Sequence, residues 1–419
     1  MKNWRLIIDD GVSASFGLAA DKTLANRVGD GLSPPTLRLY SYRSHCALAG
    51  RFQNIDNEIQ VDYCQENDVQ INRRPTGGGA IIMGGEQLGV ALMIPNNLSI
   101  IPSWEGQGWV KNNANPSDPT WSPDHVLGSR NTQSGDCVGS AQRGRSINST
   151  RELMRYFSAG LIAALNSLGI TAAFQRKNDL EVNGKKIAGL GIYRDPSGGL
   201  LFHASLLVDL DIALMLKILK TPFEKISDKE IETVAKRITT VRKESGEQVS
   251  LDRVRRKVAD GYANVFDVAL TEQDFSRDER EEIAKLEREK YLTQEWIFQT
   301  TEVPDAFGSA RKKTLAGLLD VRLALSGRII KAAYLRGDFF ISESTVAEIE
   351  AALKWLASEP VEIEKTLRTI YQKHAAELDG LPMRTLQSVI LAAVENASAQ
   401  NTQEKKPYGC FVKPSGRIA

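Results

Sequence analysis

Two adjacent arginines that run into three glycines form the strongest chemical signal in the sequence. Residues 73–80 read Arg-Arg-Pro-Thr-Gly-Gly-Gly-Ala. Glycine adopts positive φ values and lets the main chain approach a ligand closely, while a guanidinium group keeps its charge at physiological pH. The run therefore suits an anion, although it is not a Walker P-loop, because no Gly-Lys-Ser or Gly-Lys-Thr ending follows. A basic turn between two strands is the alternative.

Lys186 is the second candidate, because it lies in a predicted β-hairpin. The pair Asn183-Gly184 is a favoured two-residue turn and fixes the register of the flanking strands. The expected cross-strand pairs are Val182–Lys185, Glu181–Lys186 and Leu180–Ile187. Lys186 then faces away from the apolar side of the hairpin. There it either pairs with Glu181 in water, which contributes only about a few tenths of a kcal/mol, or contacts a bound anion.

His203 and Asp179 are two further polar candidates. Strand alternation over residues 201–207 places His203 on the same side as Ser205 and opposite the apolar residues. It is either a structural histidine or a group that orients a carboxyl or an amine. Asp179, which follows Asn178, belongs to a turn or presents a carboxylate to a metal or an amine. No Ser-His-Asp pattern is legible, and no His or Cys lies at metal-ligand spacing from His203.

The elements that must position these residues alternate between strands and helices. Strands are predicted at residues 6–8, 37–40, 69–71, 88–94 and 200–210. A helix should begin at Ser149, which forms a capping box with Glu152, and end at Gly169. The apolar residues of this helix recur at helical spacing and predict one buried face: Leu153, Phe157, Leu161, Leu165 and Leu168.

The length of 419 residues predicts more than one domain, because single cores stop growing at about 250–300 residues. Residues 103–148 are rich in Gly, Asn, Ser and Pro and are interpreted as an insertion, either a mobile loop or a lid. Residues 276–290 alternate acids and bases, which indicates a solvated helix face or an interdomain connector. Beyond them, a hairpin at 319–335 and helices to residue 397, interrupted at 378–382, predict a small α+β unit.

Composition limits the kinds of partner. The 53 Lys and Arg against 52 Asp and Glu give a net charge of +1, which argues against broad capture of nucleic acid or of an anionic membrane. The four cysteines lack a Cys-x-x-Cys pair, so neither a zinc site nor a disulfide framework is indicated. No apolar run reaches about 18 residues, and the first residues do not resemble a signal peptide. We expect a cytoplasmic protein.

The ordered set of motifs resembles the lipoate-protein ligases of the wider biotin and lipoate ligase superfamily. The motifs lie at residues 50–53, 73–80, 178–180, 184–189 and 203–211. The resemblance implies an α/β (α+β) catalytic domain with mixed sheets flanked by helices, followed by a small α+β C-terminal domain. The expected boundaries are 1–270 for the catalytic domain with its 103–148 insertion, 271–292 for a charged helical connector, 293–400 for the accessory domain and 401–419 for a tail.

The resemblance also implies an activity. Such ligases activate lipoate with ATP and Mg²⁺ to lipoyl-AMP and transfer the acyl group to a lysine of a lipoyl acceptor protein, such as a 2-oxoacid dehydrogenase E2 or the glycine cleavage H protein. Lys186 matches the family's catalytic lysine, which would stabilise charge that develops at the activated carboxyl. The residues matched to substrate or adenylate binding are Arg74, Gly77, Gly78, Gly79, Ile81, Asp179, Ala188 and His203.

Departures from the family pattern leave alternatives open. Met83 and Gly84 replace a usual His-Asp pair, and Gln87 stands where asparagine is usual. Residues 189–191 read Gly-Leu-Gly instead of Gly-Ser-Ala, a bulkier choice that could narrow the pocket or reflect another acyl preference. One rival is an ATP-free octanoyl or lipoyl transferase that works through a cysteine thioester. It requires an activated thiolate; no cysteine lies between Cys137 and Cys410, so Cys137 is its candidate. Biotin ligation and a non-catalytic scaffold that binds lipoyl domains are further alternatives.

Overall fold

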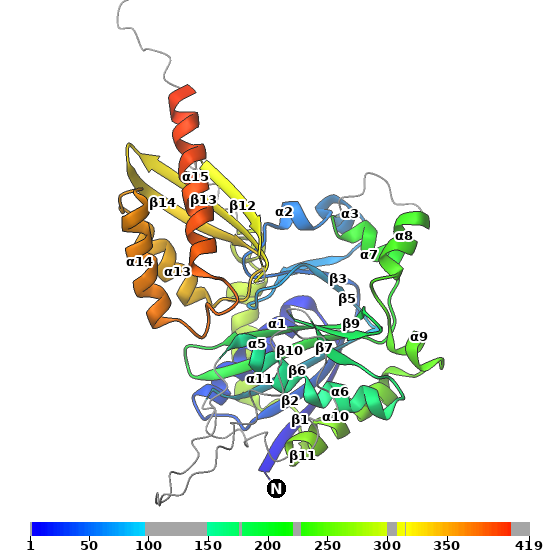
Figure 1. Cartoon of the computed structure of the whole chain (residues 1–419). Helices are drawn as coiled ribbons and strands as arrows, with labels where there is room; N and C mark the ends of the chain where they lie inside the picture. The colour runs from blue at the N-terminus through cyan, green and yellow to red at the C-terminus, as the bar shows by residue number, and fades with distance from the viewer. Residues whose placement is uncertain are drawn as a thin grey trace, which may run out of the picture. The chain divides into compact units, whose positions relative to one another are not determined.

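The largest sheet in the described residues is a mixed sheet of eight strands, which we call the central sheet (Figure 1). The structure is a computed structural model that describes residues 2–96, 149–175, 178–220, 228–299, 308–314 and 316–403. The strands lie in the order β11-β1-β2-β6-β10-β9-β8-β7, with β1 parallel to both of its neighbours and the other pairs antiparallel. Their bounds are β1 (Lys2–Val12), β2 (Thr36–Tyr42), β6 (Gln87–Pro95), β7 (Ala173–Gln175), β8 (Asp179–Val182), β9 (Lys185–Arg194), β10 (Gly199–Leu207) and β11 (Val268–Glu272).

A second, three-stranded sheet carries the arginine and glycine run. Its strands are β3 (Cys46–Ala49), β4 (Gln70–Arg73) and β5 (Ile81–Met83), in the order β4-β3-β5. The four residues of β3, the middle strand, are buried in the apolar core. Residues 74–80 connect β4 to β5, the two outer strands, and therefore form a loop that passes the end of β3. We call residues 74–80 the glycine loop.

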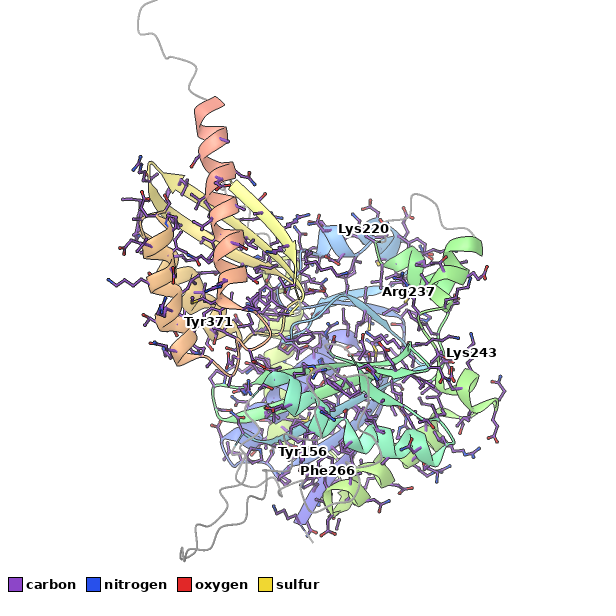
Figure 2. All side chains as sticks on the ribbon, in the orientation of Figure 1. Tyr156, Lys220, Arg237, Lys243, Phe266 and Tyr371 are labelled. Atoms are coloured by element: carbon purple, nitrogen blue, oxygen red, sulfur yellow. The ribbon has the colours of Figure 1, made fainter. Side chains whose placement is uncertain are left out.

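The helices cover the central sheet and extend beyond it. Tyr156 of α5 and Phe266 of α10 lie side by side with ring centroids 5.4 Å apart (Figure 2). Phe157 of α5 lies 5.8 Å from Phe202 of β10, so the helices pack on the apolar face of β10. The helices of this part are α1 (Ala14–Gly29), α2 (Ile55–Glu58), α3 (Val61–Glu66), α5 (Thr150–Phe157), α6 (Ala159–Ser167), α7 (Ile212–Ile218), α8 (Asp228–Ala235), α9 (Val241–Ser245) and α10 (Leu251–Phe266).

The helix predicted at residue 149 begins as expected but is not continuous. Ser149 and Glu152 form the predicted capping box, and the apolar residues of the predicted face are buried except Leu168, which is half-buried. The helix is interrupted at Ser158, between α5 and α6, and the hydroxyl of Ser158 donates to the carbonyl of Arg155 at 2.9 Å. A serine that bonds to the preceding turn competes with the helical pattern, and the prediction of one helix was wrong for this reason. The predicted insertion at 103–148 lies outside the described residues.

The small α+β unit predicted near the C-terminus is present. Three antiparallel strands, β12 (Gly308–Lys313), β13 (Leu318–Ser326) and β14 (Ile329–Gly337), pack on α13 (Glu343–Leu353), α14 (Pro360–Lys373) and α15 (Met383–Gln403). The predicted helix interruption at 378–382 is confirmed, and the turn of the hairpin falls at residues 327–328, one residue later than expected. This unit has its own apolar core, which Phe52 joins. Its domain boundaries stay a prediction.

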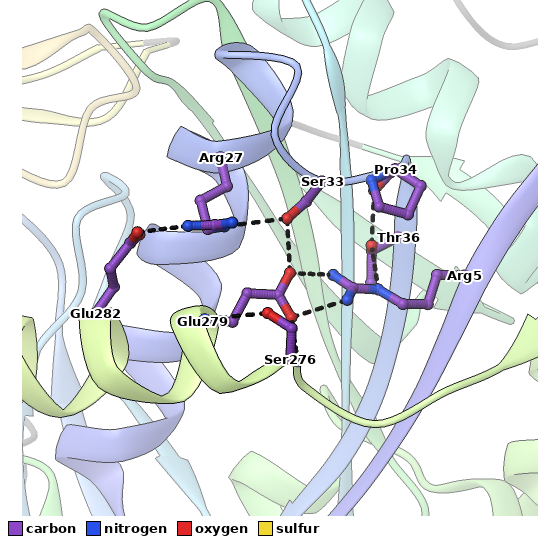
Figure 3. Close-up of polar contacts among 8 residues, drawn as sticks. All are labelled: Arg5, Arg27, Ser33, Pro34, Thr36, Ser276, Glu279 and Glu282. Atoms are coloured by element: carbon purple, nitrogen blue, oxygen red, sulfur yellow. Dashed lines mark hydrogen bonds and ion pairs between the residues drawn. The ribbon is translucent and has the colours of Figure 1, made fainter.

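The charged stretch at 276–290 forms helix α11 (Arg277–Leu286), which continues into the π-helical turn η4 (Glu287–Tyr291) and then α12 (Gln294–Phe298). One side of α11 is anchored rather than solvated. Arg5 of β1 donates to both carboxylate oxygens of Glu279, at 2.9 and 2.7 Å, and Ser33 donates to the same carboxylate at 2.6 Å (Figure 3). The side chains of Arg5 and Glu279 are only 6% and 1% exposed. A bidentate pair of this kind is strong and directional.

The Glu279 pair predicts a loss of stability when one partner is removed. Hydrogen bonds from Arg5, Ser33 and the main chain hold the pKa of Glu279 at about 2, below the ordinary 4.5. Replacing Glu279 with glutamine leaves Arg5 buried without its partner, so we expect a loss of about 3–5 kcal/mol in the free energy of unfolding. Urea denaturation measures this. Glu281→Gln is the control, because its pair with Arg277 is exposed and should contribute less than about 1 kcal/mol.

The same pair predicts a pH dependence of stability. The unfolded chain binds a proton at Glu279 near pH 4.5 and the folded chain only near pH 2, so the stabilisation is complete above pH 4.5 and is lost as the pH falls towards 2. We therefore expect the free energies of unfolding of wild type and Glu279→Gln to converge across this window. A constant difference between the two proteins from pH 6 to pH 2.5 would contradict the assignment.

In the part of the chain that the structure describes, no helix has the length and apolarity that a membrane-spanning segment needs.

Candidate functional site

The hairpin that carries Lys186 forms with one irregularity. The predicted pairs Val182–Lys185 and Glu181–Lys186 are confirmed. The third predicted pair is wrong, because Leu180 pairs with Ala188 instead of Ile187. Ile187 is thus the extra residue of a β-bulge, in which two residues of one strand oppose one of the other. The sequence gives no sign of this bulge, and it changes which side chains meet.

Lys186 is held in an ion pair with Asp179. Nζ lies 2.7 Å from Oδ1 of Asp179, and the two side chains are 33% and 22% exposed. The approach is close, but its direction is not that of a hydrogen bond. A Cβ built at Gly189 would lie 3.1 Å from this Nζ and 3.5 Å from Oγ of Ser205. An ammonium, a carboxylate and a hydroxyl therefore converge over Gly189, which the bulge pairs with Asp179.

The main chain of Lys186 is fixed by a segment that follows α8. The N–H of Lys186 donates to the carbonyl of Arg237 at 2.8 Å, and its carbonyl accepts from Thr239 at 2.9 Å. Figure 2 labels Arg237, whose side chain is exposed. Sequence reasoning missed this support, because residues 237–239 form an isolated bridge with β9 and no recognisable strand.

His203 occupies the polar face of β10, as predicted. Phe202, Ala204 and Leu206 are buried in the core, whereas His203 and Ser205 are half-buried on the other side. Nε2 of His203 lies 2.9 Å from Oγ1 of Thr76 in the glycine loop. Burial, and then the charge of Arg74, lower the pKa of His203 to about 3. The imidazole is therefore neutral at physiological pH and acts as a hydrogen-bonding group rather than a cation.

The unusual Gly-Leu-Gly at residues 189–191 has a steric explanation. A Cβ at Gly191 would lie 2.1 Å from Nε2 of His203, so the imidazole occupies the space that a usual alanine would need. Leu190 points to the opposite face by strand alternation and is buried there. Leu190 therefore does not narrow the space beside His203, and the other alternative, a different acyl preference, stays a prediction.

The two arginines of the opening motif bond to main-chain oxygens. Arg73 is fully buried, with pKa lowered to about 9 by burial, and donates to six carbonyls at 2.6–3.4 Å. Arg74 is buried too, with pKa lowered to about 10 by burial, and donates to Leu48 and Gly79 at 2.7 and 2.8 Å. In this structure the guanidinium groups shape the loop, and the role of Arg74 in holding a ligand stays a prediction.

The remaining predicted site residues are the three glycines of the glycine loop, Ile81 and Ala188. Gly78 adopts φ +97°, as the loop requires, and Gly79 is exposed. Gly77 is buried against the carbonyl of Phe339, which would lie 2.0 Å from an added Cβ. Ile81 is half-buried at the start of β5. Ala188 pairs with Leu180 and Leu206 on the core side of the sheet, so the structure does not bring it to Lys186.

Neither described cysteine fits the role of a nucleophile. Cys46 and Cys64 are buried, and burial raises the pKa of both thiols, that of Cys64 to about 11. A nucleophilic cysteine instead needs a lowered pKa and access to substrate. Cys137 and Cys410 lie outside the described residues. Among the residues described, no group of three His, Cys, Asp or Glu side chains could hold a metal ion.

Comparison with known proteins defines the family. The family model described as "Lipoyl protein ligase A/B catalytic domain" matches residues 13–101 and 139–263, just over half of the chain. The chain therefore belongs to this family, as its motifs predicted. Its fold is the lipoate ligase-like mixed α/β fold followed by a C-terminal α+β unit.

Solved structures of low sequence identity share this fold. The bi-partite lipoate protein ligase of Thermoplasma acidophilum, reported with its E2 lipoyl domain, has a TM-score of 0.54 at 22% identity and covers 71% of this chain and 97% of that one. LipL1 of P. falciparum in complex with lipoate has a TM-score of 0.63 at 16% identity, with 93% and 99% covered.

The curated relatives correct the expected activity. Octanoyltransferase LipM of Clostridioides difficile is 24% identical over 315 residues, which cover 71% of this chain and 98% of the relative. Seven further relatives at 22–26% identity carry the same name. The expectation of an ATP-dependent lipoate ligase was therefore wrong, and the transferase alternative is favoured. The part of this chain outside the match has no counterpart in those relatives.

A side chain added at Gly191 is predicted to clash with the imidazole of His203. Gly191→Ala should displace the imidazole from Thr76 and lower the free energy of unfolding by about 1–3 kcal/mol, the usual cost of overpacking. In the double variant with His203→Ala the added methyl group has room, so the effects of the two substitutions should not add. Chemical denaturation of the four proteins gives the coupling energy, and simple additivity would show that the two residues do not compete for space.

The lowered pKa of His203 predicts a second pH dependence. The unfolded chain binds a proton at this histidine near pH 6.5 and the folded chain only near pH 3, so stability should fall as the pH decreases through this interval. His203→Gln should remove that slope between pH 6.5 and 4.5, above the range in which Glu279 titrates. The measurement is the free energy of unfolding at intervals of half a pH unit. Equal slopes for both proteins would mean that His203 titrates normally.

Proposed function

We propose that this protein transfers an octanoyl group from a thioester to the ε-amino group of a lysine on a lipoyl acceptor domain. The observation that carries the proposal is the Lys186 ammonium, held by Asp179 over Gly189, in a family whose curated relatives are named octanoyltransferases. The T. acidophilum relative, reported with its E2 lipoyl domain, supports the choice of acceptor. A cytoplasmic location fits this choice.

The chemistry consists of one substitution at a carbonyl carbon. The amine of the acceptor lysine attacks the thioester carbonyl, a C–N bond forms, the C–S bond breaks, and the amine proton leaves with the thiolate as a free thiol. In this proposal Lys186 stabilises the oxyanion that develops on the carbonyl oxygen, and Asp179 orients its ammonium. His203, which is neutral and bonded to Thr76, positions the acyl group by hydrogen bonding. No step consumes ATP or Mg²⁺, because a thioester is already activated.

A covalent acyl-enzyme is a variant of the same function. It requires a thiolate, which Cys46 and Cys64 are not placed to supply, and Cys137 stays its predicted nucleophile. We propose direct transfer between the two substrates. The two routes differ in one observable, because only the covalent route leaves an octanoyl group on the protein when the acceptor is omitted.

Transfer can be tested with purified protein, octanoyl-CoA and a lipoyl domain, with mass spectrometry of the acceptor as the readout. We expect acylation without ATP, and Lys186→Met should lower kcat/KM by roughly 100-fold or more, since one oxyanion-stabilising group is lost. Lys185→Met is the matched control, because its side chain lies on the other face of the same strand, and it should retain activity. Acylation that occurs only with free octanoate and ATP would overturn the proposal.

A further inference from the structure

Outside the site around Lys186, two cations lie against the ring of Trp296. The Arg51 guanidinium is 4.7 Å from the centroid of the Trp296 ring, and Nζ of Lys290 is 3.9 Å from it. Arg51 follows β3, Lys290 belongs to η4 and Trp296 to α12. The indole is itself fixed, because its N–H donates to the carbonyl of Arg73 at 3.0 Å. The fold therefore brings two like charges onto one rigid aromatic surface.

The charge of a third cation acts on this pair. Lys22 of α1 forms an ion pair with the buried Asp195, and its ammonium lies 4.8 Å from the ring of Tyr193. Burial, and then the charges of Lys22 and Arg51, lower the pKa of Lys290, and the Glu343 carboxylate opposes them. Like charges that act on one another in this way destabilise the cluster unless an anion compensates them.

The carboxylates nearby do not match the cations one to one. Asp195 pairs with Lys22, and Glu343 of α13 accepts from Nε of Arg51 at 3.1 Å. Within the described ranges, the Lys290 ammonium has no carboxylate at ion-pairing distance and no hydrogen-bond acceptor, and its contacts are aromatic rings. The cluster thus carries one uncompensated positive charge, and it would carry two without Glu343.

Glu343 is a replaceable partner rather than a buried structural one. Its side chain is 49% exposed, whereas Arg51 is 13% exposed. It reaches the cluster from the first turn of α13, in the C-terminal α+β unit, while the cations belong to the elements around the central sheet. The Glu343 carboxylate is half-exposed and contacts Arg51, so it occupies a position that the oxygens of a bound anion could take.

We propose that Arg51, Lys290 and Lys22 form a binding site for a phosphate group, and that the Glu343 carboxylate takes the place of that phosphate in this structure. Arginine offers two parallel N–H groups that match a phosphate as well as a carboxylate, and lysine adds a compact charge. In contrast with Arg73 and Arg74, whose N–H groups bond to carbonyls of the main chain, this cluster faces an anion.

The position of the cluster suggests what carries the phosphate. Tyr193, beside Lys22, lies near the opposite end of β9 from Lys186, about 20 Å away at roughly 3.3 Å per residue. The main chain at Arg51 also contacts the glycine loop, because its backbone N–H donates to the carbonyl of Thr76 at 2.9 Å. A thioester at Lys186 whose long arm ends in a phosphate would reach both places. This step rests on the proposed function.

The binding test titrates the full-length protein with inorganic phosphate and with pyrophosphate, and isothermal titration calorimetry measures the affinity. Lys290→Gln should weaken binding about tenfold or more, the effect of losing a charged hydrogen bond. Glu343→Gln should strengthen it several-fold, because the internal competitor is gone. Glu348→Gln, in the same helix but paired with Lys373, is the control and should not change it. Denaturation curves check that each variant is folded.

The substrate test compares octanoyl-CoA with octanoyl-N-acetylcysteamine, a thioester that lacks phosphate. We expect Lys290→Gln to raise KM for octanoyl-CoA several-fold and to leave KM for the other thioester unchanged. If neither thioester is used but phosphate binding responds to both variants, the proposed function fails and the phosphate site stands. If Glu343→Gln lowers stability without strengthening phosphate or pyrophosphate binding, the contact with Arg51 is structural and the site is overturned.

Discussion

The burial of Arg73 is the constraint on which both proposed sites depend. A buried guanidinium is costly unless its N–H groups find acceptors, and Arg73 finds them in the stretches 50–53 and 296–298. Its own carbonyl accepts the indole N–H of Trp296. One side chain therefore fixes the start of the glycine loop, the loop after β3 and the end of α12. The glycine loop, which contacts His203, and the Trp296 ring, which contacts Arg51 and Lys290, are therefore coupled through Arg73.

Features set by neighbours in the sequence could be predicted. The capping box at Ser149 and the hairpin turn at Asn183-Gly184 depend on contacts within a few residues, and the face of His203 follows from strand alternation. The family could be predicted as well, because the order of its motifs is specific even though each motif is weak. The activity could not be predicted from the motifs, because the same catalytic domain resembles both solved ligases and curated transferases. No short motif in this chain identifies the acyl donor.

Features set by distant contacts could not be predicted. The two predicted partners of Lys186 were Glu181 and a bound anion, yet in the structure its ion-pair partner is Asp179, and no local sequence pattern indicates the bulge that brings the two together. Arg73 had the residue type of an anion ligand, but whether a guanidinium faces a ligand or the main chain depends on what folds over it. The cluster around Trp296 joins residues more than 200 positions apart, and each of its cations in isolation resembles an ordinary surface charge.

The bulge at Ile187 makes the number of residues, more than their types, the sensitive property of the hairpin that carries Lys186. Side chains alternate with a period of two, so a strand that lost this one residue would return to regular pairing and would turn either Lys186 or Gly189 to the opposite face. Ile187 contributes the one extra residue of the bulge and an apolar side chain that is buried in the core. A redesign of this strand can therefore exchange Ile187 for another apolar residue, but it must keep the number of residues between the turn and Gly189.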